Sequence, residues 1–139
     1  MKNAVKISVI CPDHLRVWAS NGMFVGETEV FANPSKLSRF VSALRGFPVN
    51  GSDRRDCELG TFVEALGGGG AAFRFSCMDS IGHALVEVRL RTDPRLGFGA
   101  SDLATIHISI EAALVDAFVG QLERMLLEPS QSAVLEAAG

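Results

Sequence analysis

Residues 64–91 read EALGGGGAAFRFSCMDSIGHALVEVRLR, and this stretch decides how the chain folds. Four consecutive glycines, Gly67 to Gly70, lead into two segments in which apolar residues alternate with polar ones. Alternation with a period of two is typical of half-buried strands, so the stretch predicts strands over residues 71–77 and 83–91. A phosphate-binding glycine loop needs a helix directly after it, and here a strand follows. We therefore predict that the four glycines form a hairpin loop.

The MDSIGH segment between these two strands is predicted to be a turn. A two-residue turn at Ser80 and Ile81 would force the β-branched Ile81 to a positive φ, which such residues resist. A type I turn that ends in Gly82 avoids this strain, with a bulge adjusting the strand pairing. Asp79 is then expected to accept backbone N–H groups of the turn. In this interpretation Asp79 and His83 have a structural role that needs no substrate.

The rest of the chain supplies further strands and two helices. Asn21-Gly22 is a hairpin signal between two strand segments. Asn33 and Pro34 are placed to begin a helix over residues 34–45, and Gly46 to end it. Apolar spacing of three and four also predicts a helix over residues 112–127. The other predicted strands are residues 4–10, the segments within 16–32, residues 58–66 and residues 103–110.

These elements predict one α+β domain over residues 1–128, because runs of neighbouring strands are joined by only two separated helices. The expected architecture is one mostly antiparallel sheet with both helices packed on it. A chain of 139 residues is long enough for such a core. Pro129 is expected to end the second helix, and residues 129–139 are predicted to be a flexible C-terminal tail.

Composition excludes several classes of function. The net charge of −3 and the pI near 5.6 give no basic surface for nucleic acid or anionic lipid. No segment reaches the ~18 uninterrupted apolar residues of a membrane helix, and residues 4–10 are better explained as a strand than as a signal peptide. The three cysteines are widely spaced and form no C-x-x-C pair, which predicts neither disulfides nor zinc and favours a cytoplasmic location.

The polar segment VNGSDRRDC, residues 49–57, is predicted to be a surface loop of a length that often serves in binding. Its candidate binding residues are Arg54, Arg55 and Asp56. The alternative interpretation is a solvated loop in which arginines and aspartates neutralise one another. Trp18, the only tryptophan, is predicted to be a core or rim residue, with a role as a binding anchor as the alternative.

A second candidate site lies on the predicted sheet. If residues 83–91 and 103–110 pair antiparallel, His83, Glu87 and Arg89 share a polar face with His107. Glu87 would then face His107, which suits general acid–base chemistry. The alternative is the ordinary wet face of an antiparallel sheet. The three histidines have no metal-ligand spacing, and no nucleophile motif occurs, so no metal, cofactor or catalytic residue is predicted.

From residue 37 onward the sequence resembles the WapI-like immunity protein family and related small bacterial proteins of unknown function. The stretches that carry the resemblance are LSRFVSAL (37–44), FRFSCMDSIGHALVEVRL (73–90) and IHISIEAALVDAFVGQLERML (106–126), about two-thirds of the chain. The Gly82-His83 pair is its most distinctive element. The resemblance implies a non-enzymatic module that binds and neutralises a toxin or effector.

The sequence therefore predicts a non-enzymatic protein-binding module, and the resemblance implies one of the immunity or antitoxin type. It would use the exposed sheet face together with the loop at Arg54, Arg55 and Asp56. One alternative hypothesis is a small-molecule-binding protein or weak hydrolase that uses His83, Glu87 and His107. A third is a subunit that forms a homodimer through an uncovered sheet edge or face.

Overall fold

The computed structural model describes residues 2–63, 66–95 and 99–139. Within these residues it contains two helices and eight strands, which confirms the α+β class. In chain order the elements are β1 (Ala4–Cys11), β2 (His14–Ser20), β3 (Val25–Phe31), α1 (Pro34–Leu44), β4 (Arg54–Gly60), β5 (Gly70–Cys77), β6 (His83–Arg91), β7 (Leu103–Glu111), α2 (Leu114–Leu127) and β8 (Ser132–Glu136).

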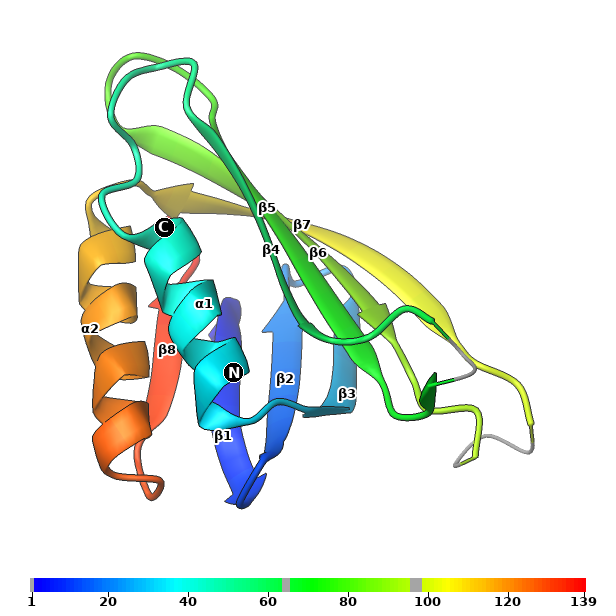
Figure 1. The fold of residues 1–139 in the computed structure, drawn as a ribbon. Coiled ribbons are helices and arrows are strands. Elements are labelled where there is room, and N and C mark those ends of the chain that lie inside the picture. Colours follow the sequence, from blue (N-terminus) through cyan, green and yellow to red (C-terminus); the bar gives the residue numbers. More distant parts are fainter. Residues whose placement is uncertain (1, 64–65, 96–98) are drawn as a thin grey trace.

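The strands form two antiparallel sheets, so the expectation of a single sheet is wrong. Sheet A has the strand order β3-β2-β1-β8, and sheet B has the order β4-β5-β6-β7. In Figure 1 the long strands of sheet B cross beside sheet A, and α1 and α2 lie next to each other in front of β8 and β1. The chain changes sheet at α1, which separates β3 from β4. Alternation identifies each strand but does not say which strand edges pair.

The core lies between the inner faces of the two sheets and the helices. Phe40 of α1 meets Phe73 of β5 edge to face, with ring centroids 5.1 Å apart. Phe47, just after α1, meets Phe75 in the same way at 5.9 Å. Edge-to-face pairs of this kind add about 0.5–1.5 kcal/mol to the burial itself. Other fully buried members of the core are Val5, Ile7, Leu44, Val86, Ile108, Phe118, Leu122 and Leu135.

The helix α1 begins and ends where its sequence predicts. The side chain of Asn33 accepts a hydrogen bond from the backbone N–H of Lys36 at 2.8 Å, and Pro34 opens the helix. Gly46 has a φ of 82°, which is the left-handed conformation that turns the chain away from the helix. Helix α2 begins at Leu114, two positions later than the predicted start at residue 112. None of the described helices is long and apolar enough to cross a membrane.

The prediction of a flexible tail over residues 129–139 is wrong. Residues 132–136 form β8, which pairs antiparallel with β1. Ala133 and Leu135 are fully buried, while the backbone N–H of Ala137 donates to the carbonyl of Asn3 at 2.9 Å. The strand is only five residues long, so its alternation is too short to stand out from a loose terminus. Pairing with β1 supplies the hydrogen bonds that hold it.

The four-glycine segment connects β4 to β5, as predicted, but it does more than turn the chain. A Cβ at Gly69 would overlap the carbonyl of Glu29 and lie 2.8 Å from the carbonyl of Arg91. A Cβ at Gly68 would lie 2.7 Å from the ring of Phe31. The glycines therefore let the loop backbone pack directly against β3 and the end of β6. The preceding strand runs over 54–60 rather than 58–66, and residues 64–65 of that prediction lie outside the described residues.

The MDSIGH turn confirms the expected roles of Asp79 and Gly82. Gly82 has a φ of 101°, and Oδ1 of Asp79 accepts the backbone N–H groups of Ile81 and His83 at 2.9 and 3.1 Å. The expected bulge is absent from the pairing of β5 with β6, where Cys77 stands opposite Ala84. A turn of four residues, 79–82, preserves the parity of the two strands, so no extra residue is needed.

Candidate functional site

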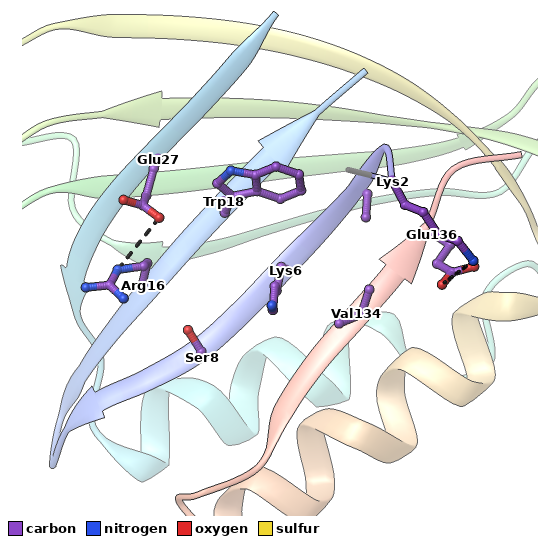
Figure 2. A pocket seen from close by; sticks show the side chains of 9 residues that line it. Lys2, Lys6, Ser8, Arg16, Trp18, Glu27, Val134 and Glu136 are labelled. Atoms are coloured by element: carbon purple, nitrogen blue, oxygen red, sulfur yellow. Dashed lines mark ion pairs between the residues drawn. The ribbon is translucent and has the colours of Figure 1, made fainter. Parts of the chain in front are cut away.

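The outer face of sheet A, which points away from the helices, carries the most distinctive group of exposed side chains (Figure 2). The register places Lys6 of β1 directly opposite Trp18 of β2, and Trp18 directly opposite Glu27 of β3. In the next row Ser8 lies opposite Arg16. Directly opposed side chains on one face of an antiparallel sheet are in contact range, so these residues form one surface.

These side chains surround a hollow of about 420 Å³. Small side chains and long charged ones both line it. The lining residues are Lys2, Ala4, Lys6, Ser8, Arg16, Trp18, Glu27, Val134 and Glu136. We call this the Trp18 hollow. Figure 2 shows that the indole of Trp18 stands beside the space between Lys6 and Lys2.

The charged groups of the Trp18 hollow are only loosely paired. Arg16 lies 3.7 Å from Glu27 and 3.6 Å from Glu29, and all three side chains are well exposed to solvent. Exposed pairs at such distances contribute about 0–1 kcal/mol. Lys2 and Glu136 are 3.6 Å apart and even more exposed. Within the described residues, Lys6 has no carboxylate within 4 Å. The hollow thus holds positive charge that the fold does not use.

Trp18 is half-buried on this outer face and is not part of the core. Of the predicted core or rim positions, the core position is wrong, because Trp18 points outward from β2, a central strand of sheet A. The alternation of β2 was the signal that could have shown this orientation. Leu15, Val17 and Ala19 are buried, whereas Arg16 shares the parity of Trp18. A tryptophan that shares its face with an exposed arginine points away from the core.

The outer face of sheet B carries the predicted histidine and carboxylate pair. Glu87 stands opposite His107, with Oε2 of Glu87 3.1 Å from Nε2 of His107, which confirms their predicted juxtaposition. Asp56 and Arg74 continue the same row and are 2.8 Å apart. The row therefore alternates acid and base across four strands, which is a stable arrangement for a wet sheet face.

A second hollow, of about 410 Å³, lies on sheet B above the small side chain of Ala72. Glu58 and Arg89 flank Ala72 in one cross-strand row. The guanidinium of Arg89 lies over the ring of Phe62, 5.3 Å from its centroid. This cation–π contact joins Arg89 of β6 to Phe62, which lies just after β4.

His83 does not join Glu87 and His107. It lies four positions before Glu87 on β6, roughly 13 Å along the strand. Its Nδ1 is 2.6 Å from Oδ2 of Asp79, and its Nε2 is 3.8 Å from Glu111. The hydrogen bond to Asp79 raises the pKa of His83 above its usual range, with Glu111 adding to the effect, and the same bond lowers the pKa of Asp79. The structure divides the predicted constellation into two separate pairs.

The prediction that Arg54, Arg55 and Asp56 lie in a surface loop is wrong, because all three belong to β4. Arg55 holds the preceding connection in place: its Nε and Nη2 bind Asp53 at 2.8 and 2.9 Å. Its Nη1 also donates to the carbonyls of Ala43 and Arg45. The guanidinium lowers the pKa of Asp53. Arg54 and Asp56 remain exposed on the outer face of sheet B.

The described residues contain no group of three or more histidine, cysteine or acidic side chains arranged to hold a metal. Burial raises the pKa of the Cys57 thiol to about 12, so this cysteine is a thiol at neutral pH and a poor nucleophile. Cys11 and Cys77 are also free thiols. Sγ of Cys11 lies 3.7 Å from Nδ1 of His14, and Sγ of Cys77 donates to the carbonyl of Asn50 at 3.5 Å.

Comparisons of the chain with protein-family models, with curated proteins and with solved structures found no match. The resemblance to the WapI-like immunity family therefore stays a prediction from the sequence. The geometry of the two outer sheet faces is what remains to support a function.

Proposed function

We propose that the chain is a non-enzymatic protein-binding module whose site is the Trp18 hollow on the outer face of sheet A. The observation that carries the proposal is the position of Trp18. The only tryptophan of the chain lies half-buried in an open hollow, on the face opposite the core. Tryptophan and arginine are the side chains most enriched among the residues that dominate protein–protein binding.

The surroundings of Trp18 support this role. The strands β1 and β2 are the two central strands of sheet A, so the hollow sits on a rigid platform. The side chains that line the hollow with Trp18 include the hydrogen-bond donors Lys6, Ser8 and Arg16. A flat aromatic ring with polar groups around it resembles the centre and rim of a protein interface.

The kind of partner is taken from the sequence resemblance. A toxin or effector would be the partner of a protein similar to the WapI-like immunity family, and the cysteine pattern would place the complex in the cytoplasm. The proposal of Arg54, Arg55 and Asp56 as the contact loop is replaced by the Trp18 hollow, because Arg55 is occupied by Asp53. A homodimer through the same face is the competing arrangement.

The test compares partner capture by the wild-type chain and by Trp18→Ala, with Phe24→Ala as the matched control. Phe24 is an aromatic residue in the β2–β3 connection, 69% exposed and outside the hollow. Circular dichroism and thermal unfolding must show that both variants fold. We expect Trp18→Ala to lose a stoichiometric partner that wild type and Phe24→Ala retain. Retention of every captured protein by Trp18→Ala would refute the proposal. Light scattering of the purified chain separates the homodimer from the complex.

A second candidate is a small-molecule site in the hollow above Ala72, supported by the adjacent Glu87–His107 pair. Its volume falls within the ~300–1,000 Å³ typical of ligand sites. Hydrolysis by His83, Glu87 and His107 together is not supported, because His83 lies with Asp79 instead. A thermal-shift screen against metabolites tests this candidate. A ligand that stabilises the wild type but not Ala72→Leu, which fills the hollow, would support it, whereas equal stabilisation of both would not.

A further inference from the structure

We infer that the Trp18 hollow takes a carboxylate side chain of an acidic protein segment, held between Lys6 and Arg16 beside the indole. This inference rests on the proposed function and names the chemistry of the partner. It follows from how charge is distributed over the four strands of sheet A.

The two central strands present only neutral and donor groups on the outer face. Going along the strands, the residues of this face are Ala4, Lys6, Ser8 and Ile10 on β1, and His14, Arg16, Trp18 and Ser20 on β2, of which Ala4 and Ser20 are buried. Lys6 and Ser8 are neighbours on β1, and each stands opposite Trp18 or Arg16 on β2. An ammonium, a hydroxyl, a guanidinium and an indole therefore surround one position, separated by about 5 Å across the strands and about 7 Å along them.

The two cations of this group are held only weakly by the fold. Lys6 has no carboxylate within 4 Å among the described residues. Arg16 reaches Glu27 and Glu29 only at 3.7 and 3.6 Å, in exposed geometry that contributes little. An incoming carboxylate can take a closer, hydrogen-bonded position on the guanidinium, since bidentate contacts between arginine and carboxylate are the strong ones. The ring of Trp18 on one side lowers the local dielectric and strengthens that contact.

The acidic residues of the face lie on the two edge strands. Glu27 and Glu29 are on β3, and Glu136 is on β8. An anion is therefore favoured along the β1–β2 line and disfavoured on either side of it. This pattern fits an extended segment with isolated acidic side chains. It does not fit a nucleic acid, because a continuous row of phosphates would meet the flanking carboxylates and the net charge of −3.

Trp18 itself is the probe for the test, because it is the only tryptophan and its fluorescence reports directly on the hollow. The titrant is a short oligoglutamate peptide, with an oligolysine peptide of equal length and inorganic phosphate as comparison titrants. The variants are Lys6→Gln and Arg16→Gln. Arg39→Gln is the matched control, because it removes the same charge from an exposed residue of α1 that lies outside the hollow.

We expect oligoglutamate to produce a saturable change in Trp18 fluorescence that weakens as salt rises. Lys6→Gln and Arg16→Gln should each weaken it about tenfold, as expected for the loss of one charged hydrogen bond, while Arg39→Gln should not. Oligolysine should have no effect. The inference is overturned if oligoglutamate leaves the fluorescence unchanged, if Lys6→Gln and Arg16→Gln bind like wild type, or if inorganic phosphate acts as well as the peptide.

The capture experiment separates this inference from the proposed function. A partner lost by Trp18→Ala but kept by both Lys6→Gln and Arg16→Gln would support the protein-binding site and refute the inference of an acidic segment. A partner kept by Trp18→Ala would refute the proposed site. A partner lost by all three variants and kept by Arg39→Gln is the result that supports both.

Discussion

Replacement of Arg91 by methionine should destabilise the fold strongly, because this arginine organises the four-glycine loop. Arg91 is only 2% exposed. Its Nη2 donates to the carbonyls of Thr61 and Gly68, both at 2.7 Å, and its Nη1 donates to Oγ of Ser101 at 3.1 Å. Methionine replaces the unbranched stem of the arginine side chain but has no guanidinium, so these acceptors lose their donor.

The magnitude follows from the two carbonyls. A buried acceptor that loses its partner costs about 1–3 kcal/mol, so the two together cost about 2–6 kcal/mol. Removing the guanidinium also removes the cost of burying its charge, which offsets part of this loss. We expect a net loss of about 2–4 kcal/mol, equivalent to roughly 6–14 °C in the thermal midpoint for a chain of this length.

Urea unfolding followed by Trp18 fluorescence and by circular dichroism measures this loss. The midpoint should fall while the slope with urea stays constant, since the surface exposed on unfolding is unchanged. Arg91→Lys should recover only part of the stability, because a single ammonium lacks the planar fork that bridges Thr61 and Gly68. A loss below about 1 kcal/mol for Arg91→Met would refute the structural role assigned to these hydrogen bonds.

Three further predictions concern glycines, β4 and pH. Gly69→Ala should destabilise by several kcal/mol because its Cβ would overlap backbone, whereas Gly120→Ala, in open space on α2, should stabilise by about 0.5–1 kcal/mol in the same denaturation assay. Arg55→Ala should cost about 1–3 kcal/mol through its bonds to Asp53 and backbone carbonyls, and Arg54→Ala should leave the thermal midpoint within error; equal effects would contradict the assignment of Arg55. Because the hydrogen bond to Asp79 raises the pKa of His83 in the folded chain, the protonated imidazole adds its full share to the free energy of unfolding below the usual pKa near 6.5. This stabilisation is lost as pH rises through the folded-state pKa, so His83→Gln should flatten the dependence of stability on pH above pH 6.5. An unchanged slope there would show that this imidazole does not couple to folding.

Local patterns in the sequence were sufficient for most individual elements. Asn33 and Pro34 begin α1 where predicted, since capping depends on residues within one turn. The facing of Glu87 and His107 was predicted from alternation in two strands, because the parity of a strand determines which side chains share a face. Asp79 and Gly82 were assigned correctly for a similar reason, because a turn is closed by its own residues.

Errors arose where a residue's role depends on distant partners. Arg55 was placed in a solvated loop because its neighbours are polar, yet its contacts include the end of α1. Residues 129–139 were predicted to form a loose tail. The prediction failed because the five-residue strand β8 is held by its pairing with β1, which no local pattern shows. His83 shares the parity of Glu87, but parity does not measure the distance along a strand.

The sequence by itself determined the secondary structure class, both helices and the polarity of most strand faces, since these depend on periodicities of two and 3.6 residues and on short-range caps. Tertiary structure decided the rest: the division into two sheets, the pairing of β8 with β1, the hydrogen bonds of Arg91 to the glycine loop, and the position of Trp18 beside Lys6. The physical reason is that a sheet face or edge acquires its environment from strands remote in the chain. Lys6 lies opposite both Trp18 and Val134, and no local pattern in the sequence joins these three residues.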